Sequence, residues 1–99
     1  MEKKLARKDA VSVLKKILDP ELNLDIYNLE LIYGIEIKKG NSILVKMTFT
    51  SPTCPYGPML MSQVKEELKR KGFKNPEIDI VFEPVWTPSE KVKMLLGLQ

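Results

Sequence analysis

Hydrophobic residues recur along this chain at two spacings, and the changes from one to the other mark the expected elements. Between residues 5 and 18 the apolar positions lie three or four residues apart with lysines opposite, as in a helix with one buried face. We expect a helix over Leu5–Leu18 that ends before Asp19-Pro20, because the residue preceding a proline is pushed out of the helical conformation. Glu21–Glu30 is expected to be irregular. The predicted buried face of the helix consists of Val11, Leu14, Ile17 and Leu18.

Strict alternation of apolar and polar residues follows in two segments, which predicts two strands, each with one buried face. The turn between them is Lys39-Gly40-Asn41, where Gly and Asn both tolerate a positive φ, so the pair is expected to be an antiparallel hairpin. The apolar positions are Tyr33, Ile35 and Ile37 in the first strand, and Ile43, Val45, Met47 and Phe49 in the second.

Helical spacing returns over Pro58–Lys71, where proline suits the first turn and Gly72 provides the C-terminal stop. Ile78, Ile80 and Phe82 then alternate as in a third strand. The sequence Thr87-Pro88-Ser89-Glu90 has the form of a capping box with proline at the first helical position, and it predicts a short helix that ends at Gly97. The predicted buried stripe of the longer helix consists of Leu60, Val64 and Leu68.

These elements predict an α+β fold in the order α-β-β-α-β-α. Each strand has one apolar face and each helix one apolar stripe, which favours a two-layer sandwich with helices mainly on one face of a small three-stranded mixed sheet. No repeat, low-complexity tract or linker interrupts the 99 residues, so we expect one domain over residues 1–99.

Composition excludes several kinds of chemistry. One cysteine and no histidine exclude an internal disulfide, a Cys/His zinc site within one chain, and Ser-His-Asp or Cys-His catalysis. The first 16 residues hold six Lys or Arg against two acids, a charge of +4, so the rest of the +3 chain sums to −1. The basic bias therefore belongs to one helix face, and a nucleic-acid partner is not expected. The start lacks a long apolar run, so we expect no membrane span, and a lone thiol suits the cytoplasm.

Cys54 is the most informative residue for chemistry. It lies in a proline-bracketed loop just before the second helix, where unpaired N–H groups and the helix dipole would favour the thiolate. Thr50, Ser51 and Thr53 crowd hydroxyls around it. The alternative interpretation is that Cys54 is a small buried hydrophobe and that the hydroxyls serve turns and caps.

Asp19-Pro20-Glu21 is the second candidate, because two carboxylates two residues apart can bind a cation or transfer protons. A helix terminator with solvated acids is the simpler interpretation.

Trp86 is expected to cover the core with its indole N–H bonded to a partner, rather than to anchor another protein.

The order of these motifs resembles that of the PaaD/SufT-like family of metal–sulfur cluster biosynthetic proteins, which have the iron–sulfur cluster assembly (FSCA) domain. The resemblance covers about Val11 to Gly97, and its most specific part is the stretch that ends in Thr-Ser-Pro-Thr-Cys-Pro. One position departs from the pattern: Glu30 stands where the family usually has the glycine of Leu-Gly-Leu, and it would be strained if that glycine uses a positive φ. The matching segments are Asp19-Pro20-Glu21, Leu29–Ile35, Met47–Pro55, Pro84–Pro88 and Leu96-Gly97.

This resemblance implies an accessory role in iron–sulfur protein maturation, as carrier, scaffold or adaptor rather than enzyme. Cys54 would be a thiolate ligand of a transient iron or iron–sulfur cluster, or a persulfide-type acceptor. Thr50 and Ser51 would hydrogen-bond the sulfur, and Asp19 and Glu21 would supply oxygen contacts or a proton relay. Because one thiol cannot hold a cluster tightly in a monomer, a homodimer or a client apoprotein would supply further ligands.

Two other functions remain open at this stage. In the first, the chain is a non-catalytic adaptor that recruits clients to the assembly proteins through Trp86, Tyr56 and the methionines. The second is a KH-like nucleic-acid binder, which the sequence disfavours because the Gly-x-x-Gly loop of that class is missing.

Overall fold

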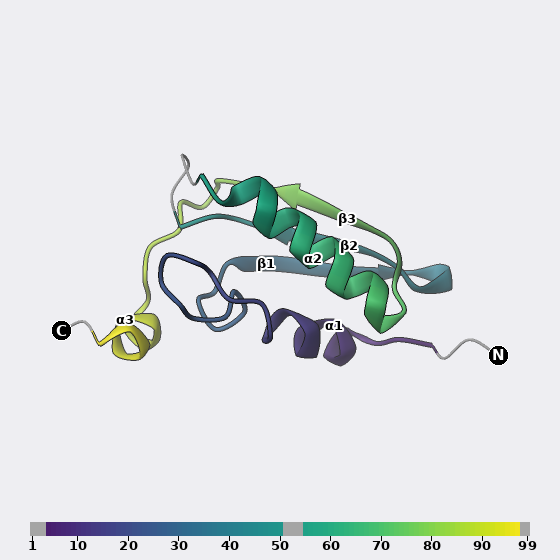
Figure 1. Cartoon of the computed structure of the whole chain (residues 1–99), viewed down its shortest axis with the longest axis horizontal. Coiled ribbons are helices and arrows are strands. Elements are labelled where there is room, and N and C mark those ends of the chain that lie inside the picture. Colours follow the sequence, from purple (N-terminus) through teal and green to yellow (C-terminus); the bar gives the residue numbers. More distant parts are fainter. Residues whose placement is uncertain (1–3, 51–54, 98–99) are drawn as a thin grey trace.

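The computed structural model describes residues 4–50 and 55–97. In that part of the chain three α-helices and three strands follow each other in the order α-β-β-α-β-α (Figure 1), so the predicted α+β sandwich is confirmed. A short 3-10 turn, Lys39–Asn41, joins the first two strands. The elements are α1 (Arg7–Leu14), β1 (Ile32–Lys38), β2 (Ser42–Met47), α2 (Gly57–Lys71), β3 (Lys74–Ile80) and α3 (Glu90–Leu96).

The sheet has the order β1-β2-β3 and is mixed. β1 runs antiparallel to β2, with Ile35 opposite Val45, and β3 runs parallel to β2, with Ile78 opposite the same valine. Helices α1 and α2 pack against each other on one side of the sheet, and α3 lies apart from them beyond one end of it (Figure 1). The central strand β2 therefore contributes its apolar face to the core between the two layers.

The core follows the predicted pattern in β2 and α2. Ile43, Val45 and Met47 of β2 are at most 2% exposed, because alternate residues of a strand point to the same face. In α2 the predicted stripe is buried as a unit, since residues three and four apart share one side of a helix. Those stripe residues are Leu60, Val64 and Leu68.

The hairpin turn adopts the backbone that its sequence predicts. Gly40 has φ +80° and Asn41 has φ +65°, which are the left-handed conformations that these two residue types tolerate. Asn41 is buried, and its Oδ1 accepts a 2.9 Å hydrogen bond from the backbone N–H of Leu5. The turn thus also fixes the start of the described chain against the sheet.

The first helix is shorter than predicted. It ends at Leu14 rather than Leu18, because the backbone beyond it pairs with the segment that follows. Ile17 accepts a hydrogen bond from the N–H of Ile26, and Asp19 donates one to the carbonyl of Leu24. The helical phase is lost there, so Leu18 is half exposed instead of buried.

Other boundaries also differ from the prediction: α1 starts at Arg7 rather than Leu5, and β2 ends at Met47, before Phe49. The third strand ends at Ile80, and Phe82 lies beyond it with 43% of its surface exposed. The capping box was placed two residues early: Ser89, not Thr87, is the N-cap of α3, and its Oγ accepts a hydrogen bond from the N–H of Val92. The predicted end of this helix at Gly97 is confirmed, with φ +78°.

Candidate functional site

Two threonine hydroxyls are buried where the chain leaves β2. Thr48 is 1% exposed, and its backbone N–H donates a 2.9 Å hydrogen bond to the carbonyl of Leu31. The Oγ1 atoms of Thr48 and Thr50 have no hydrogen-bond partner in the part of the chain that the structure describes. A buried hydroxyl without a partner costs about 1–3 kcal/mol, so both atoms need an explanation.

Ser51 and Cys54, the central pair of the predicted site, lie outside the described residues. Their flanks are described on both sides. Thr50 precedes them, and α2 begins at Gly57 with proline in its first turn and with no acidic residue there. The N-terminus of α2, which follows Cys54 in sequence, therefore carries no acidic side chain that would offset the positive end of the helix dipole.

Asp19 is buried for a local reason. Its Oδ1 accepts hydrogen bonds from the backbone N–H groups of Glu21 at 2.8 Å and Leu22 at 3.0 Å. This is an Asx turn, in which an aspartate side chain replaces a backbone acceptor. With the Asp19 side chain and backbone both bonded, the loop is held in one shape, and Glu21 is exposed on it.

That the Asp19-Pro20-Glu21 loop and the segment with Cys54 form one site stays a prediction, because Ser51 and Cys54 lie outside the described residues. No hydrogen bond links Asp19 or Glu21 to the Thr50 hydroxyl, which has no partner among residues 4–50 and 55–97. Within the same ranges, no three carboxylates or thiols lie close enough to hold a metal ion. The sequence prediction also missed Thr48, because a threonine alternating with buried Met47 suggests the solvent face of a strand.

Aromatic side chains line the junction between β2 and α2. The rings of Phe49 and Phe82 are 6.4 Å apart at an angle of 57°. A Cβ placed on Gly57 would lie 3.0 Å from the Phe49 ring, so glycine lets the start of α2 approach this ring closely. Nearby in sequence, Tyr56 and Met59 are 40% and 57% exposed. The described residues that flank residues 51–54 in sequence thus include exposed apolar and aromatic side chains.

Two side-chain hydrogen bonds hold the segment that follows β3, one to the turn before β1 and one from β1 itself. The indole Nε1 of Trp86 donates to the carbonyl of Leu29 at 2.8 Å, so the prediction of a bonded indole over the core is confirmed. The hydroxyl of Tyr33 donates to the carbonyl of Pro84 at 2.9 Å, and burial raises the pKa of this phenol. A groove of about 870 Å³ lies beside these contacts.

Glu30 adopts the strained backbone that its position suggested. Its φ is +64°, in the left-handed region where a residue with a Cβ is unfavourable and glycine is not. The N–H of Glu30 donates to the carbonyl of Tyr27, which closes a tight turn before β1.

No helix in residues 4–50 or 55–97 has both the length and the apolar character needed to cross a membrane.

Comparison with known proteins gives the same picture of fold and family. Residues 7–80 match the family described as iron–sulfur cluster assembly protein. The chain is 35% identical over 97 residues to the Fe-S protein maturation auxiliary factor YitW of Bacillus subtilis, covering 94% of this chain and 95% of that protein. It is 38% identical over 86 residues to the Fe-S protein maturation auxiliary factor SufT of Staphylococcus aureus, covering 83% and 98%.

Solved structures show the same fold. A conserved hypothetical protein from Thermotoga maritima superposes with a TM-score of 0.83 at 36% identity, over 99% of this chain and 100% of that one. A domain of unknown function, DUF59, from Bacillus anthracis gives a TM-score of 0.84 at 31% identity, over 93% and 92%.

Proposed function

Because this chain belongs to the iron–sulfur cluster assembly protein family, we propose that it is a non-catalytic accessory factor in the maturation of iron–sulfur proteins. In this role it works with the assembly machinery and delivers iron or a cluster, its transient cargo, to client apoproteins. Three relatives that cover most of its length are named Fe-S protein maturation auxiliary factors, which supports the proposal.

One structural observation carries the proposal. The buried hydroxyls of Thr48 and Thr50, at the end of β2, have no partner among the described residues, and they directly precede the segment that contains the single thiol of the chain. Donors of this kind can hydrogen-bond a thiolate or a sulfide and so stabilise its negative charge. Their cost to folding is explained if they serve such a ligand.

Cys54 is the cargo ligand in this proposal. The free N–H groups and the positive dipole end of the first turn of α2 favour a thiolate nearby, and that turn has no acidic residue to oppose them. Thr50 and Ser51 donate hydrogen bonds to the sulfur. One thiol does not complete the usual four ligands of a cluster, so a second copy of the chain or the client supplies the others.

The two acids have different roles in this scheme. Oδ1 of Asp19 accepts hydrogen bonds from the N–H groups of Glu21 and Leu22, so this oxygen has a structural role in shaping the loop. Exposed Glu21 is the carboxylate that supplies an oxygen contact to iron or takes up a proton, while Asp19 holds the loop that presents it.

Anaerobic reconstitution with iron and sulfide tests the carrier role. We expect iron-dependent visible absorbance in the wild type and its loss in Cys54→Ala. Gln63→Ala, an exposed position on α2, is the matched control and keeps the absorbance. No absorbance in the wild type, or equal absorbance in Cys54→Ala, would rule out cargo binding through this thiol.

An adaptor without cargo is the second candidate, and exposed apolar side chains favour it. Met59, Val85 and Met94 are 57%, 71% and 79% exposed, as in surfaces that contact other proteins. Trp86 is a weaker anchor than its residue type suggests, because its N–H is bonded internally. Pull-down with purified assembly proteins separates the candidates: the adaptor binds them equally well as Cys54→Ala and shows no reconstitution.

A further inference from the structure

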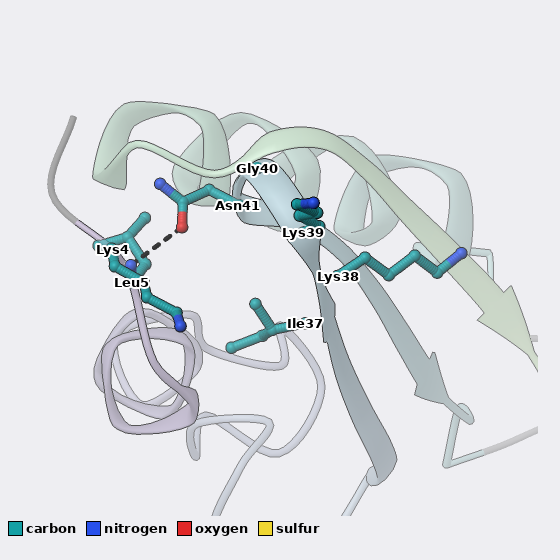
Figure 2. A pocket seen from close by; sticks show the side chains of 7 residues that line it. All are labelled: Lys4, Leu5, Ile37, Lys38, Lys39, Gly40 and Asn41. Carbon is teal, nitrogen blue, oxygen red and sulfur yellow. Dashed lines mark hydrogen bonds between the residues drawn. The ribbon is translucent and has the colours of Figure 1, made fainter. Parts of the chain in front are cut away.

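A basic pocket lies at the hairpin tip, at the end of β2 opposite to the Thr48 and Thr50 hydroxyls. It has a volume of about 490 Å³ and forms between the N-terminal segment and the β1–β2 turn (Figure 2). Strand β2 starts beside this pocket and ends at Met47, so about 20 Å of strand separates the pocket from Thr48. The lining residues are Lys4, Leu5, Ile37, Lys38, Lys39, Gly40 and Asn41.

We propose that this pocket binds an acidic peptide segment of a protein partner. Lys4, Lys38 and Lys39 are exposed and come from two distant parts of the chain. Among residues 4–50 and 55–97, no acidic side chain lines the pocket. Lys4 and Lys39 border the hollow, while the Lys38 side chain runs away from it (Figure 2). Lysines around one hollow create a positive potential that attracts carboxylates and speeds their association.

The hollow is held open by a specific contact. Oδ1 of buried Asn41 accepts the hydrogen bond from the N–H of Leu5, which ties the N-terminal segment to the hairpin across 36 residues. Leu5 is itself buried and would contact any Cβ placed on Gly72 at 3.3 Å, so it also packs against the end of α2. The walls of the pocket are therefore fixed by the fold.

Apolar groups in the pocket favour a peptide over other anions. Leu5 and Ile37 lie on opposite sides, and Figure 2 shows Ile37 extending toward the space between them. Partly buried Ile37 offers apolar surface to an aliphatic side chain flanked by carboxylates, whereas buried Leu5 contributes to the wall. A nucleic acid would call for aromatic stacking partners or arginine, and no such residue of the described chain lines this pocket.

The basic surface continues onto α1. Arg7, Lys8 and Lys15 line a second, shallower hollow of about 420 Å³ on that helix. A segment longer than the hairpin pocket could follow this face, while Asp9, the acid in the first turn, caps the helix through the N–H of Ala6. A partner held in this way leaves the opposite end of the sheet accessible for the transfer of cargo.

Fluorescence anisotropy with a labelled peptide of glutamates around a central leucine tests the proposal. We expect saturable binding at about 0.05 M salt that weakens as salt screens the charges. The charge-reversal variant Lys4→Glu/Lys39→Glu should bind at least about tenfold more weakly, equivalent to about 1.4 kcal/mol. The matched control is Lys65→Glu/Lys91→Glu, which carries the same charge change on exposed positions of α2 and α3. Its affinity for the peptide should stay within about twofold of the wild type.

Further measurements test which ligand the pocket prefers. Replacing the leucine of the peptide with serine should weaken binding, and inorganic phosphate should not compete beyond its effect on ionic strength. Equal losses in the two charge-reversal variants, tighter binding of a labelled RNA oligonucleotide, or no binding at low salt would overturn the proposal. None of these measurements uses iron or Cys54, so their failure would not affect the proposed maturation role.

Discussion

The indole Nε1 of Trp86 donates a 2.8 Å hydrogen bond to the backbone carbonyl of Leu29, 57 residues earlier in the chain. This bond joins the segment after β3 to the turn before β1. Leu29 is fully buried, so its carbonyl depends on partners within the protein. The contact therefore holds two irregular segments together where no ladder of strands does so.

Trp86→Phe should reduce the free energy of unfolding by about 1–2 kcal/mol, because the phenyl ring fills much of the space but leaves the carbonyl of Leu29 without its donor. Denaturant unfolding followed by circular dichroism measures this change in stability. Tryptophan fluorescence does not serve here, because the substitution removes the single tryptophan. Val85→Ala, at a 71% exposed neighbour, is the control and should change stability by less than about 0.5 kcal/mol. Equal effects of the two substitutions would contradict the assigned role of the indole.

The two acids of Asp19-Pro20-Glu21 should separate in their effects. Asp19→Ala removes the acceptor of two backbone N–H groups, and we expect a loss of about 1–2 kcal/mol in stability. Glu21→Gln should leave stability within about 0.5 kcal/mol, since the side chain is exposed, yet lower iron loading in reconstitution. Iron loading unchanged in Glu21→Gln would remove this residue from the proposed site.

Glu30 should be more stable as glycine. At φ +64° the substitution Glu30→Gly relieves left-handed strain of about 1–2 kcal/mol, partly offset by the greater entropy of glycine in the unfolded chain. The expected net gain is up to about 1 kcal/mol, measured by thermal and denaturant unfolding. Glu30→Val tests the same backbone in the opposite direction and should destabilise the protein. A loss of stability in Glu30→Gly would show that the side chain matters more than the strain.

Tyr33 gives a dependence on alkaline pH. Burial raises its pKa in the folded protein above the unfolded value of about 10, so the folded state favours the protonated phenol. This contribution to stability is complete below that pH and is lost as pH rises through the folded pKa. The difference in unfolding free energy between wild type and Tyr33→Phe should shrink between about pH 9 and pH 11. Curves that stay parallel over this range would contradict the assignment.

Periodic segments of the sequence predicted the fold well, because burial of one face decides them. In β2 and α2, local pattern and tertiary packing agree, and the buried residues are those expected. The prediction that Leu18 is buried is wrong, because pairing of Ile17 with Ile26 ends the helix early. A partner nine residues away in sequence leaves no local pattern of hydrophobic residues. The capping position was missed because both Thr87 and Ser89 suit a cap, and the bond to Val92 decides between them.

The candidate site was less predictable than the fold. Oδ1 of Asp19 accepts hydrogen bonds from two amides of its own loop, a structural role that the spacing did not predict, while its role as a cation ligand stays a prediction. Thr48 was overlooked because its burial depends on chain segments that meet only after folding. The basic pocket likewise combines Lys4 with Lys39, which no sequence window contains together. The strain at Glu30, in contrast, follows from the family resemblance, because Glu30 stands where the family usually has a glycine.

The central claim is that Cys54 supports the maturation of iron–sulfur proteins. Its most direct test is the specific activity of an iron–sulfur enzyme in bacterial cells that lack their own factor of this family and express either wild type or Cys54→Ala at equal levels. We predict that the wild type restores the activity per unit of enzyme protein and that Cys54→Ala does not, while Gln63→Ala restores it fully. Full restoration by Cys54→Ala would contradict the claim.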